Sequence, residues 1–176
     1  QEEKQPISPD VFDVREFVES DPKGIPFPQA DDFEKVINII ELVNSEVNSK
    51  EDLADDFSFD PRQADYYSNA AKYLELVEKG KEKGTISLTK FGYELLGMPR
   101  SKRHEKLIKQ ILKHKVFYDS FNAMKSGKGS TEHIVEIMRR NSVLKGGSER
   151  TFKRRARTII SWCKWIEEKI EESKSG

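Results

Sequence analysis

The sequence predicts a mostly α protein of two tandem winged-helix or helix-turn-helix units, with a small β-wing in the first unit and a proline-rich arm before it. Three observations support this fold class. Apolar residues recur at three- and four-residue spacing in most segments after residue 31, as in helices that bury one face. Residues 85–88 alternate like a strand, after a turn bracketed by two glycines. Five of the seven prolines lie within residues 1–30.

The proline-rich segment, residues 1–30, is acidic, and we expect an extended arm or linker there with one short amphipathic piece around Val11–Val18. Proline removes a backbone hydrogen-bond donor and disfavours helix in the residue before it. The string GIPFPQADD, residues 24–32, marks the boundary to the first folded unit.

We expect the first winged-helix unit over residues 31–99, beginning with a helix after Asp32. A second helix is predicted after Ser49 and a third after Asp60, because serine and aspartate are favoured N-cap residues. The third helix is expected to run to about Leu76, with a buried stripe at helical spacing.

The wing of this unit is predicted from the string GKEKGTISLT, residues 80–89. Two glycines bracket a basic turn, and the strand at residues 85–88 is expected to pair with residues 76–77 as a hairpin. Thr89 then caps a short helix. The order helix, helix, turn, helix, wing, helix is that of a winged helix.

We expect the second unit over residues 100–173. One helix is predicted over Arg103–Phe117, and Ser130 and Ser148 are the predicted N-caps of two further helices. The order helix, short helix, turn and long basic helix indicates a second helix-turn-helix with at most a rudimentary wing. The two units share this architecture and not their sequence.

The two halves of the chain carry opposite charges, although the net charge is zero. Residues 1–80 hold 8 Lys/Arg and 20 Asp/Glu, a net of −12, whereas residues 81–176 hold 23 and 11, a net of +12. Such asymmetry is typical of a protein with a basic binding face. The alternative is that the two halves neutralise each other.

The string SERTFKRRARTIISWCKWI, residues 148–166, gathers basic residues on one side of the predicted last helix. At about 100° per residue, Arg150, Arg154 and Arg157 fall opposite the apolar side, with Lys153 at the flank. Arginine suits this place, since its planar guanidinium contacts phosphate or guanine with two donors. We therefore predict that Arg150, Lys153, Arg154 and Arg157 bind double-stranded DNA.

The apolar side of the same helix is the predicted core of the second unit, and it holds Phe152, Ala156, Ile159, Ile160, Cys163 and Ile166. The charges along the helix run against its dipole, because the basic residues come early and Glu167 and Glu168 come late. This arrangement favours a binding function. The alternative is a solvated face that pairs with the acidic first half of the chain.

The third helix of the first unit is a second candidate DNA site. Its outward face is predicted to carry Arg62, Gln63, Tyr66, Asn69 and Tyr73, and the wing tip to carry Lys81 and Lys83. Arg, Gln and Asn contact base edges, and Lys contacts phosphates. Residues 31–98 nevertheless hold 8 basic and 15 acidic residues, a net of −7. The unit therefore either contacts DNA with charge supplied by the second unit, or acts as a protein-protein interaction module.

No residue pattern predicts a catalytic centre, a metal site or a cofactor site. His104, His114 and His133 lack a clustered carboxylate or cysteine partner, and no glycine-rich phosphate loop occurs. The single cysteine, Cys163, excludes an internal disulfide framework. No apolar run approaches the roughly 20 residues of a membrane span. We expect a cytoplasmic protein that has no membrane contact, no cofactor and no catalytic activity in this part of the chain.

Three strings are more distinctive than a generic helix-turn-helix: DPRQADYYSNAAKYLELVE at 60–78, LTKFGYELLG at 88–97 and RTFKRRARTIISWCKWI at 150–166. Over about residues 25–170 they resemble the tandem winged-helix DNA-recognition region of type II, particularly type IIS, restriction endonucleases and related restriction-system proteins. In that family such a region recognises a short asymmetric DNA sequence while a separate nuclease domain cleaves. The resemblance implies sequence-specific recognition, with a nuclease or methyltransferase domain as partner in the same or another chain.

Overall fold

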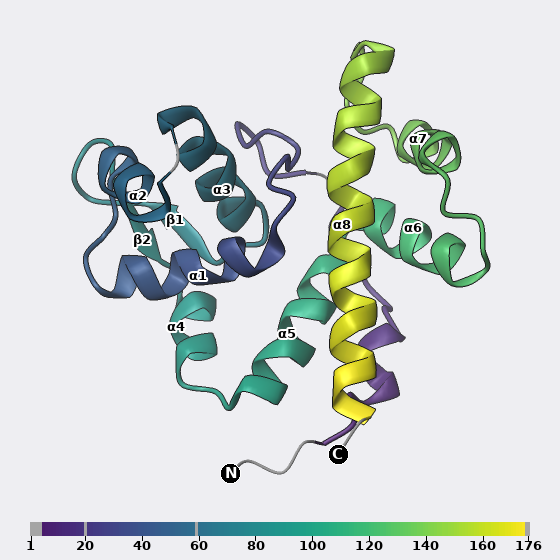
Figure 1. Cartoon of the computed structure of the whole chain (residues 1–176), viewed down its shortest axis with the longest axis horizontal. Coiled ribbons are helices and arrows are strands. Elements are labelled where there is room, and N and C mark those ends of the chain that lie inside the picture. The colour runs from purple at the N-terminus through teal and green to yellow at the C-terminus, as the bar shows by residue number, and fades with distance from the viewer. Residues whose placement is uncertain (1–4, 20, 59, 175–176) are drawn as a thin grey trace. The chain divides into compact units, whose positions relative to one another are not determined.

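The computed structural model of the chain describes residues 5–19, 21–58 and 60–174 (Figure 1). These residues form eight α-helices, one short 3₁₀ helix and one two-stranded antiparallel sheet, and helices account for 62% of the described residues. The predicted mostly α class with a small β-hairpin is therefore confirmed. None of the helices in the described part of the chain combines the length and the low charge needed to cross a membrane.

The chain divides into two compact units. Residues 21–97 form one, which we call the hairpin unit, and residues 1–20 with residues 98–176 form the other, the helical unit. The proline-rich segment that the sequence suggests as an arm is thus divided between the units. Apolar side chains account for this, because Val11 is buried within the helical unit and Phe27 within the hairpin unit.

The hairpin unit contains α1 (Phe33–Asn44), α2 (Lys50–Phe57), α3 (Pro61–Tyr73), β1 (Val77–Lys79), β2 (Ile86–Leu88) and α4 (Lys90–Leu96). The predicted hairpin is confirmed, since β1 and β2 pair antiparallel with Val77 opposite Leu88. Helix α3 ends before the predicted limit at Leu76, because Glu75 adopts a left-handed backbone conformation with φ 61° and turns the chain into β1.

The segment between α1 and α2 also joins the sheet. An isolated antiparallel bridge connects Ser49 to Thr85, and the Ile86 amide donates a hydrogen bond to the Asn48 carbonyl at 3.0 Å. This bridge lies beyond the end of the ladder formed by β1 and β2. The hairpin is therefore anchored to the start of α2, which fixes its orientation relative to α2 and α3 within the unit.

The predicted helix starts of the hairpin unit are confirmed. Ser49, Asp60 and Thr89 each accept a hydrogen bond from the backbone amide three residues on, at 3.2, 2.8 and 3.0 Å. Such caps satisfy amides that have no partner within the helix. The core of the unit is built chiefly by α1, which buries Phe33, Val36, Ile37, Ile39, Ile40 and Val43.

Gly92 lies where α4 approaches the backbone that leads into β1. A Cβ atom at Gly92 would sit 2.3 Å from the Leu76 carbonyl oxygen, so the backbone of one of them must shift. We expect Gly92→Ala to lower the free energy of unfolding of the hairpin unit by about 1–3 kcal/mol. Gly97→Ala is the matched control, because its Cβ would meet the Glu94 carbonyl at an ordinary 3.7 Å. Urea unfolding followed by circular dichroism tests both, and equal stability of the two variants would refute the clash.

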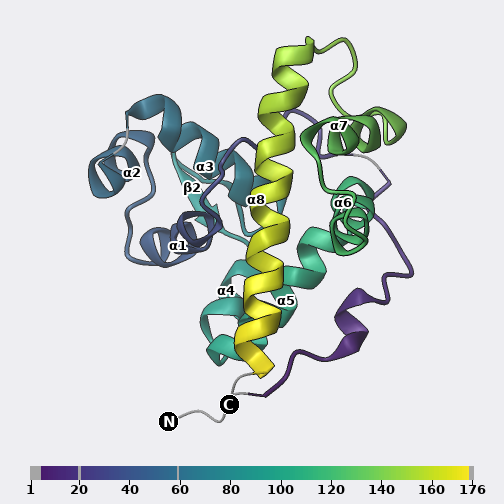
Figure 2. The ribbon, with the colours of Figure 1, turned by 45° about the vertical axis from the view of Figure 1, so that its right-hand side comes forward.

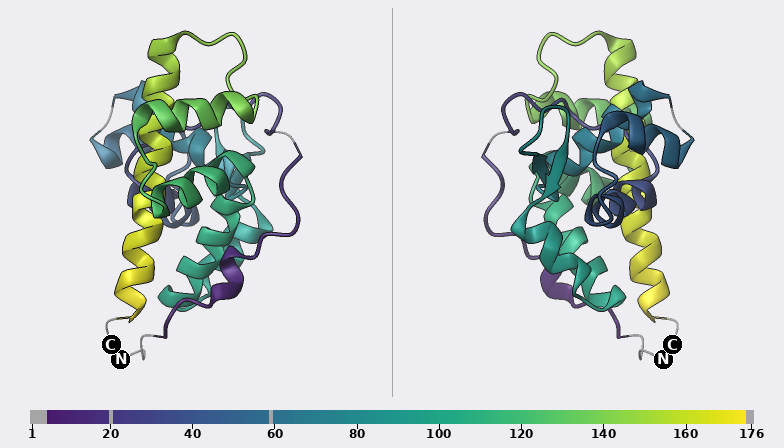
Figure 3. Two further views of the ribbon diagram at one scale, coloured as in Figure 1. Left: turned by 90° about the vertical axis from the view of Figure 1, so that its right-hand side faces the viewer. Right: turned by 90° about the vertical axis from the view of Figure 1, so that its left-hand side faces the viewer.

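The helical unit contains the 3₁₀ helix η1 (Pro9–Phe12) and the helices α5 (Arg100–Leu112), α6 (Lys115–Lys125), α7 (Thr131–Arg140) and α8 (Glu149–Lys174). Helices α6 and α7 both pack on α8, as Figures 2 and 3 show. The single helix predicted over Arg103–Phe117 is wrong. The chain leaves the helix after Leu112, and the extended backbone of His114, with φ −83° and ψ 113°, starts α6 in a new direction.

Helix α8 is the centre of the helical unit. The predicted caps are present, since Ser130 and Ser148 each accept a hydrogen bond from the amide three residues on, at 3.2 Å in both cases. The predicted core residues of α8 are buried except Ile160, which is half-buried. The buried side is wider than predicted, because it also includes Thr158, Trp162 and Trp165. Trp162 is 0% exposed and stacks on Phe117 of α6 at 5.1 Å between ring centroids.

The N-terminal segment is part of the helical unit. Phe12 stacks on Phe121 of α6 with 5.9 Å between ring centroids. The Ile7 amide donates to the Ser173 hydroxyl near the end of α8 at 3.1 Å. Figure 3 shows η1 beside α5. These contacts tie residues 5–19 to helices that follow more than a hundred residues later in the sequence.

His114 gives the helical unit a pH dependence. The side chain is 5% exposed, and burial lowers its pKa from 6.5 to about 4. The unfolded chain therefore binds a proton between these pH values that the folded chain does not. This contribution to stability is complete above pH 6.5 and is lost as the pH falls towards 4, by up to roughly 3 kcal/mol.

Thermal melts across this pH range, compared between the wild type and His114→Gln, measure the effect. We expect the variant to lose less stability than the wild type on acidification, since its side chain does not titrate. Identical slopes for the wild type and His114→Gln would contradict the assignment.

Candidate nucleic-acid interface

Four basic side chains are exposed on the N-terminal half of α8: Arg150, Lys153, Arg154 and Arg157. Their neighbour Arg155 is buried and lies outside this face. Within the described part of the chain, none of the four forms a salt bridge or a side-chain hydrogen bond. The four positive charges are therefore accessible to an anion outside the chain. We call this surface the basic face.

A hollow of about 530 Å³ opens beside the basic face. It is lined by Thr131, Glu149, Arg150, Lys153 and Arg157. Thr131 is the first residue of α7 and Glu149 the first residue of α8, so the hollow lies where these two helices begin. Three of its five lining residues are cationic and one is a hydroxyl donor, which is a lining suited to an anion.

The one carboxylate in the lining is engaged by another residue. Arg139 of α7 donates from Nη2 to Glu149 Oε2 at 2.5 Å. The Arg139 guanidinium also lies 4.2 Å from the centroid of the Phe152 ring. A cation on an aromatic face is attracted by the ring quadrupole, so two contacts hold Arg139 in place. The charge of Glu149 is thereby offset beside the cations of the hollow.

The sequence did not identify Thr131, Arg139 or Glu149 as neighbours of the basic residues of α8. The N-cap signal at Ser130 places Thr131 at the start of a helix, but it carries no information about contact with α8. The pairing of Arg139 with Glu149 spans the turn between α7 and α8, and no spacing rule for one helix predicts it.

The electrostatics around the basic face favour anions. Residues 98–176 hold 20 Lys/Arg and 9 Asp/Glu, a net of +11. A surface with this excess attracts negatively charged partners and raises their rate of encounter.

The predicted contacts of the hairpin unit lie on α3. Arg62 and Gln63 are exposed in its first turn, and Tyr66 and Asn69 are half-buried. Arg62 Nε donates to the Tyr66 hydroxyl at 2.5 Å, and the guanidinium lies 5.7 Å from the centroid of that ring. These contacts order the Arg62 side chain along the surface of α3.

Tyr73 was predicted on the same outward face, and that prediction is wrong. Its side chain is 0% exposed, and its hydroxyl donates to Asp21 Oδ1 at 3.0 Å. Phe27 meets its ring edge-on with 5.8 Å between centroids. Burial raises the pKa of Tyr73 well above its usual value, and burial also raises the pKa of Asp21. Residues 21–30 fold back over the end of α3, which the pattern within the helix does not reveal.

The surroundings of α3 are partly acidic. Helix α2, directly before it, exposes Glu51, Asp52, Asp55 and Asp56. Lys50 is bound to Asp65 of α3 at 2.6 Å. Lys81 and Lys83 are exposed in the turn between β1 and β2. The hairpin unit thus offers basic side chains at the turn and carboxylates on α2.

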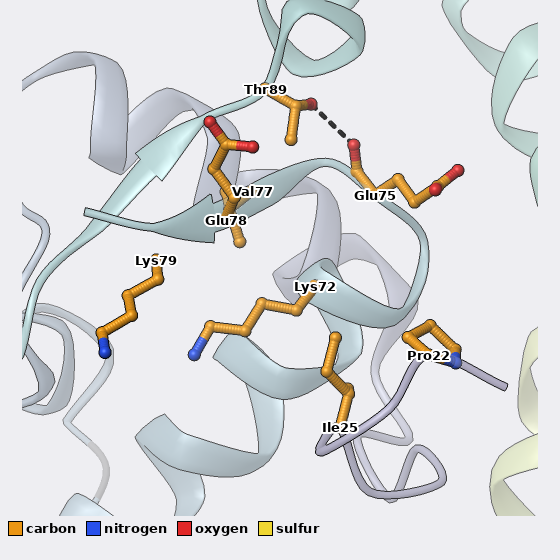
Figure 4. A pocket seen from close by; sticks show the side chains of 8 residues that line it. All are labelled: Pro22, Ile25, Lys72, Glu75, Val77, Glu78, Lys79 and Thr89. Carbon is orange, nitrogen blue, oxygen red and sulfur yellow. Dashed lines mark hydrogen bonds between the residues drawn. The ribbon is translucent and has the colours of Figure 1, made fainter. Parts of the chain in front are cut away.

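A second hollow, of about 400 Å³, lies within the hairpin unit (Figure 4). It is lined by Pro22, Ile25, Lys72, Glu75, Val77, Glu78, Lys79 and Thr89. The Thr89 hydroxyl donates to the Glu75 carbonyl at 2.6 Å at its rim. Two lysines and two glutamates balance each other here, so the lining favours neither anions nor cations.

Comparison with known proteins gives a family and no function. The family described as "Domain of unknown function (DUF7226)" matches residues 35–171, which include most of both units. Neither a curated protein nor a solved structure matches the chain.

Proposed function

The chain belongs to the DUF7226 family, and on that premise we propose that it binds double-stranded DNA through the basic face of α8. One observation carries the proposal: Arg150, Lys153, Arg154 and Arg157 are exposed and form no ion pair with the described residues. Basic side chains that neutralise phosphates and release counterions supply much of the affinity of proteins for DNA. The engagement of Glu149 by Arg139 keeps this end of α8 positive.

The order of elements supports the finer proposal of tandem winged-helix and helix-turn-helix units. In the hairpin unit a helix, a bridge, two helices and a hairpin follow one another, and α3 has the position of a recognition helix. In the helical unit α7, a turn and α8 follow one another. Arg62, Gln63 and Asn69 of α3 would contact base edges, and Lys81 and Lys83 would contact phosphates.

We further propose that the chain is the recognition part of a restriction system, with cleavage or methylation performed by another domain. The support is the resemblance of its three strings to restriction-endonuclease recognition regions. Sequence-specific binding to a short asymmetric site is the property to test, by selection from a random duplex library. Enrichment of no site would reduce the proposal to non-specific DNA binding.

Duplex DNA is favoured over single-stranded nucleic acid by the surface aromatics. Recognition of unpaired bases uses exposed aromatic side chains as stacking platforms. Among the described residues, Tyr93 and Val18 are the large hydrophobic side chains that stand exposed. A single exposed ring does not make a platform, whereas the basic face suits a phosphate backbone.

Fluorescence anisotropy with a labelled random-sequence duplex tests the function. We expect binding at low salt, with an observed binding constant that falls linearly in a plot of log K against log salt concentration. With about four phosphates neutralised, the slope is expected near −3.6. No binding at low salt would overturn the proposal.

The alternative, a protein-protein interaction module, is favoured by the hairpin unit alone. Exposed carboxylates on α2 would repel DNA phosphates near α3. Binding of a protein partner that persists in the absence of DNA and at high salt would support this function for the hairpin unit. It explains the exposed cations of the basic face less well.

A further inference from the structure

The hollow at the start of α7 and α8 brings cations and a hydroxyl from two helices around one space, whereas an exposed charged surface would offer them from one side only. Arg150, Lys153 and Arg157 approach it from one helix, and Thr131 approaches it from another. The five N–H donors of each arginine and the hydroxyl of Thr131 can bond several oxygens of one group. A space of about 530 Å³ admits a phosphate together with its water and part of its sugar.

We propose that this hollow is an anion subsite that seats one phosphodiester of a nucleic-acid backbone; the proposal rests on the function proposed above. A phosphodiester carries one negative charge shared by its two non-bridging oxygens, and the guanidinium fork can bond both oxygens with two parallel donors. Arg154 does not line the hollow and contacts the nucleic acid outside it. The seated phosphate fixes the register of the backbone along α8 and leaves base readout to other side chains.

Arg139 is a positioning residue of this subsite. Its bond to Glu149 Oε2 and its contact with the Phe152 ring hold the carboxylate of the lining in an ion pair. Without Arg139, the Glu149 carboxylate would face the phosphate uncompensated and repel it. Arg139 therefore acts through Glu149 and not by contacting the nucleic acid.

Binding of inorganic phosphate alone tests the subsite without DNA. We expect the amide resonances of Thr131, Arg150 and Lys153 to shift on titration of ¹⁵N-labelled protein with phosphate at constant ionic strength. The same titration of Arg150→Gln/Arg157→Gln should abolish these shifts. Shifts of equal size in both proteins, or no shifts at these residues in the wild type, would overturn the subsite.

Charge removal at Glu149 tests the subsite with DNA. Glu149→Gln is expected to tighten duplex binding about threefold to tenfold, since it removes a negative charge a few ångströms from the phosphate. The matched control is Glu171→Gln, which makes the same change in net charge about 33 Å further along α8 by the rise of a helix. That distance exceeds the screening length of about 10 Å, so its affinity should stay near the wild-type value. Equal effects of the two variants would overturn the proposal.

A double-mutant cycle separates the role of Arg139 from direct contact. Arg139→Ala is expected to weaken duplex binding severalfold in the wild-type background and to have little effect in the Glu149→Gln background. Equal losses in both backgrounds would mean that Arg139 touches DNA itself, which contradicts its positioning role.

These results distinguish the subsite from the proposed function. If the wild type binds no duplex, the proposed function fails, and with it the assignment of the anion to a nucleic-acid backbone. If the duplex binds but Glu149→Gln behaves like Glu171→Gln, only the subsite fails. Competition with poly-glutamate identifies the source of the anion. If poly-glutamate displaces the labelled duplex at the same low concentration as unlabelled DNA does, the nucleic-acid assignment is overturned in favour of an acidic peptide.

Discussion

Replacing Arg154 and Arg157 together with alanine is expected to weaken duplex binding about thirtyfold. The two side chains are exposed one helical turn apart on the basic face and form no ion pair with described residues. Each substitution removes about 1 kcal/mol of binding free energy from a contact with the DNA backbone or a base edge, which gives about 2 kcal/mol in total. The slope of log K against log salt should also become shallower by about 1.8, because two phosphates are no longer neutralised.

The control for this variant is Lys102→Ala/Lys106→Ala. Both lysines are exposed on α5, so the double variant removes the same charge from the helical unit without changing the basic face. We expect its affinity to stay within about twofold of the wild type, a change smaller than the loss of one contact. Anisotropy at a fixed salt concentration measures all three proteins. Equal losses in the two variants would show that binding follows net charge and not the face of α8.

Trp162→Ala is expected to lower the free energy of unfolding of the helical unit by about 3–5 kcal/mol. Trp162 is 0% exposed, and its ring stacks on Phe117 at an interplanar angle of 20°. Truncation removes the buried indole and leaves a cavity between α6 and α8 that neighbouring helices fill only in part. A loss of this size approaches the whole stability of a small unit.

Both tryptophans of the chain lie in α8, so tryptophan fluorescence follows the unfolding of the helical unit, with Trp165 as the remaining probe in the variant. Lys164→Ala serves as the control, because Lys164 is exposed on the same helix and its truncation should change stability by less than about 0.5 kcal/mol. A midpoint of urea unfolding for Trp162→Ala equal to that of Lys164→Ala would contradict the role of Trp162 as a core residue.

Local signals in the sequence predicted the local structure well. Ser49, Asp60 and Thr89 cap helices as expected, because a cap depends on a bond between residues three apart. The hairpin was predicted for a similar reason, since glycines and a basic turn separate two short apolar segments. The exposure of Arg154 was predicted from helical periodicity, because the apolar residues of α8 that face the core leave Arg154 on the opposite side.

Contacts between distant segments were not predictable. Periodicity continues smoothly through His114, so nothing in the pattern marked the break between α5 and α6. Tyr73 lies on the polar side of α3 by period, yet Asp21 and Phe27 cover it from a segment about fifty residues earlier. The pairing of Arg139 with Glu149 likewise depends on how α7 and α8 meet. Such contacts follow from tertiary packing, which helical spacing alone does not encode.

The packing of residues 5–19 with α5, α6 and α8 makes the hairpin unit an insertion of 77 residues, Asp21–Gly97, within a discontinuous helical unit. The rings of Phe17 and Tyr118 meet edge-on with 5.1 Å between their centroids. This contact closes a loop that contains the whole hairpin unit, and closing such a loop carries an entropic cost. Folding of the hairpin unit before this contact forms would shorten the effective loop and lower the entropic cost of closing it. A fragment that starts at residue 98 would keep α8 but lack Phe12 and Phe17, which pack against Phe121 and Tyr118 of α6 in the full chain.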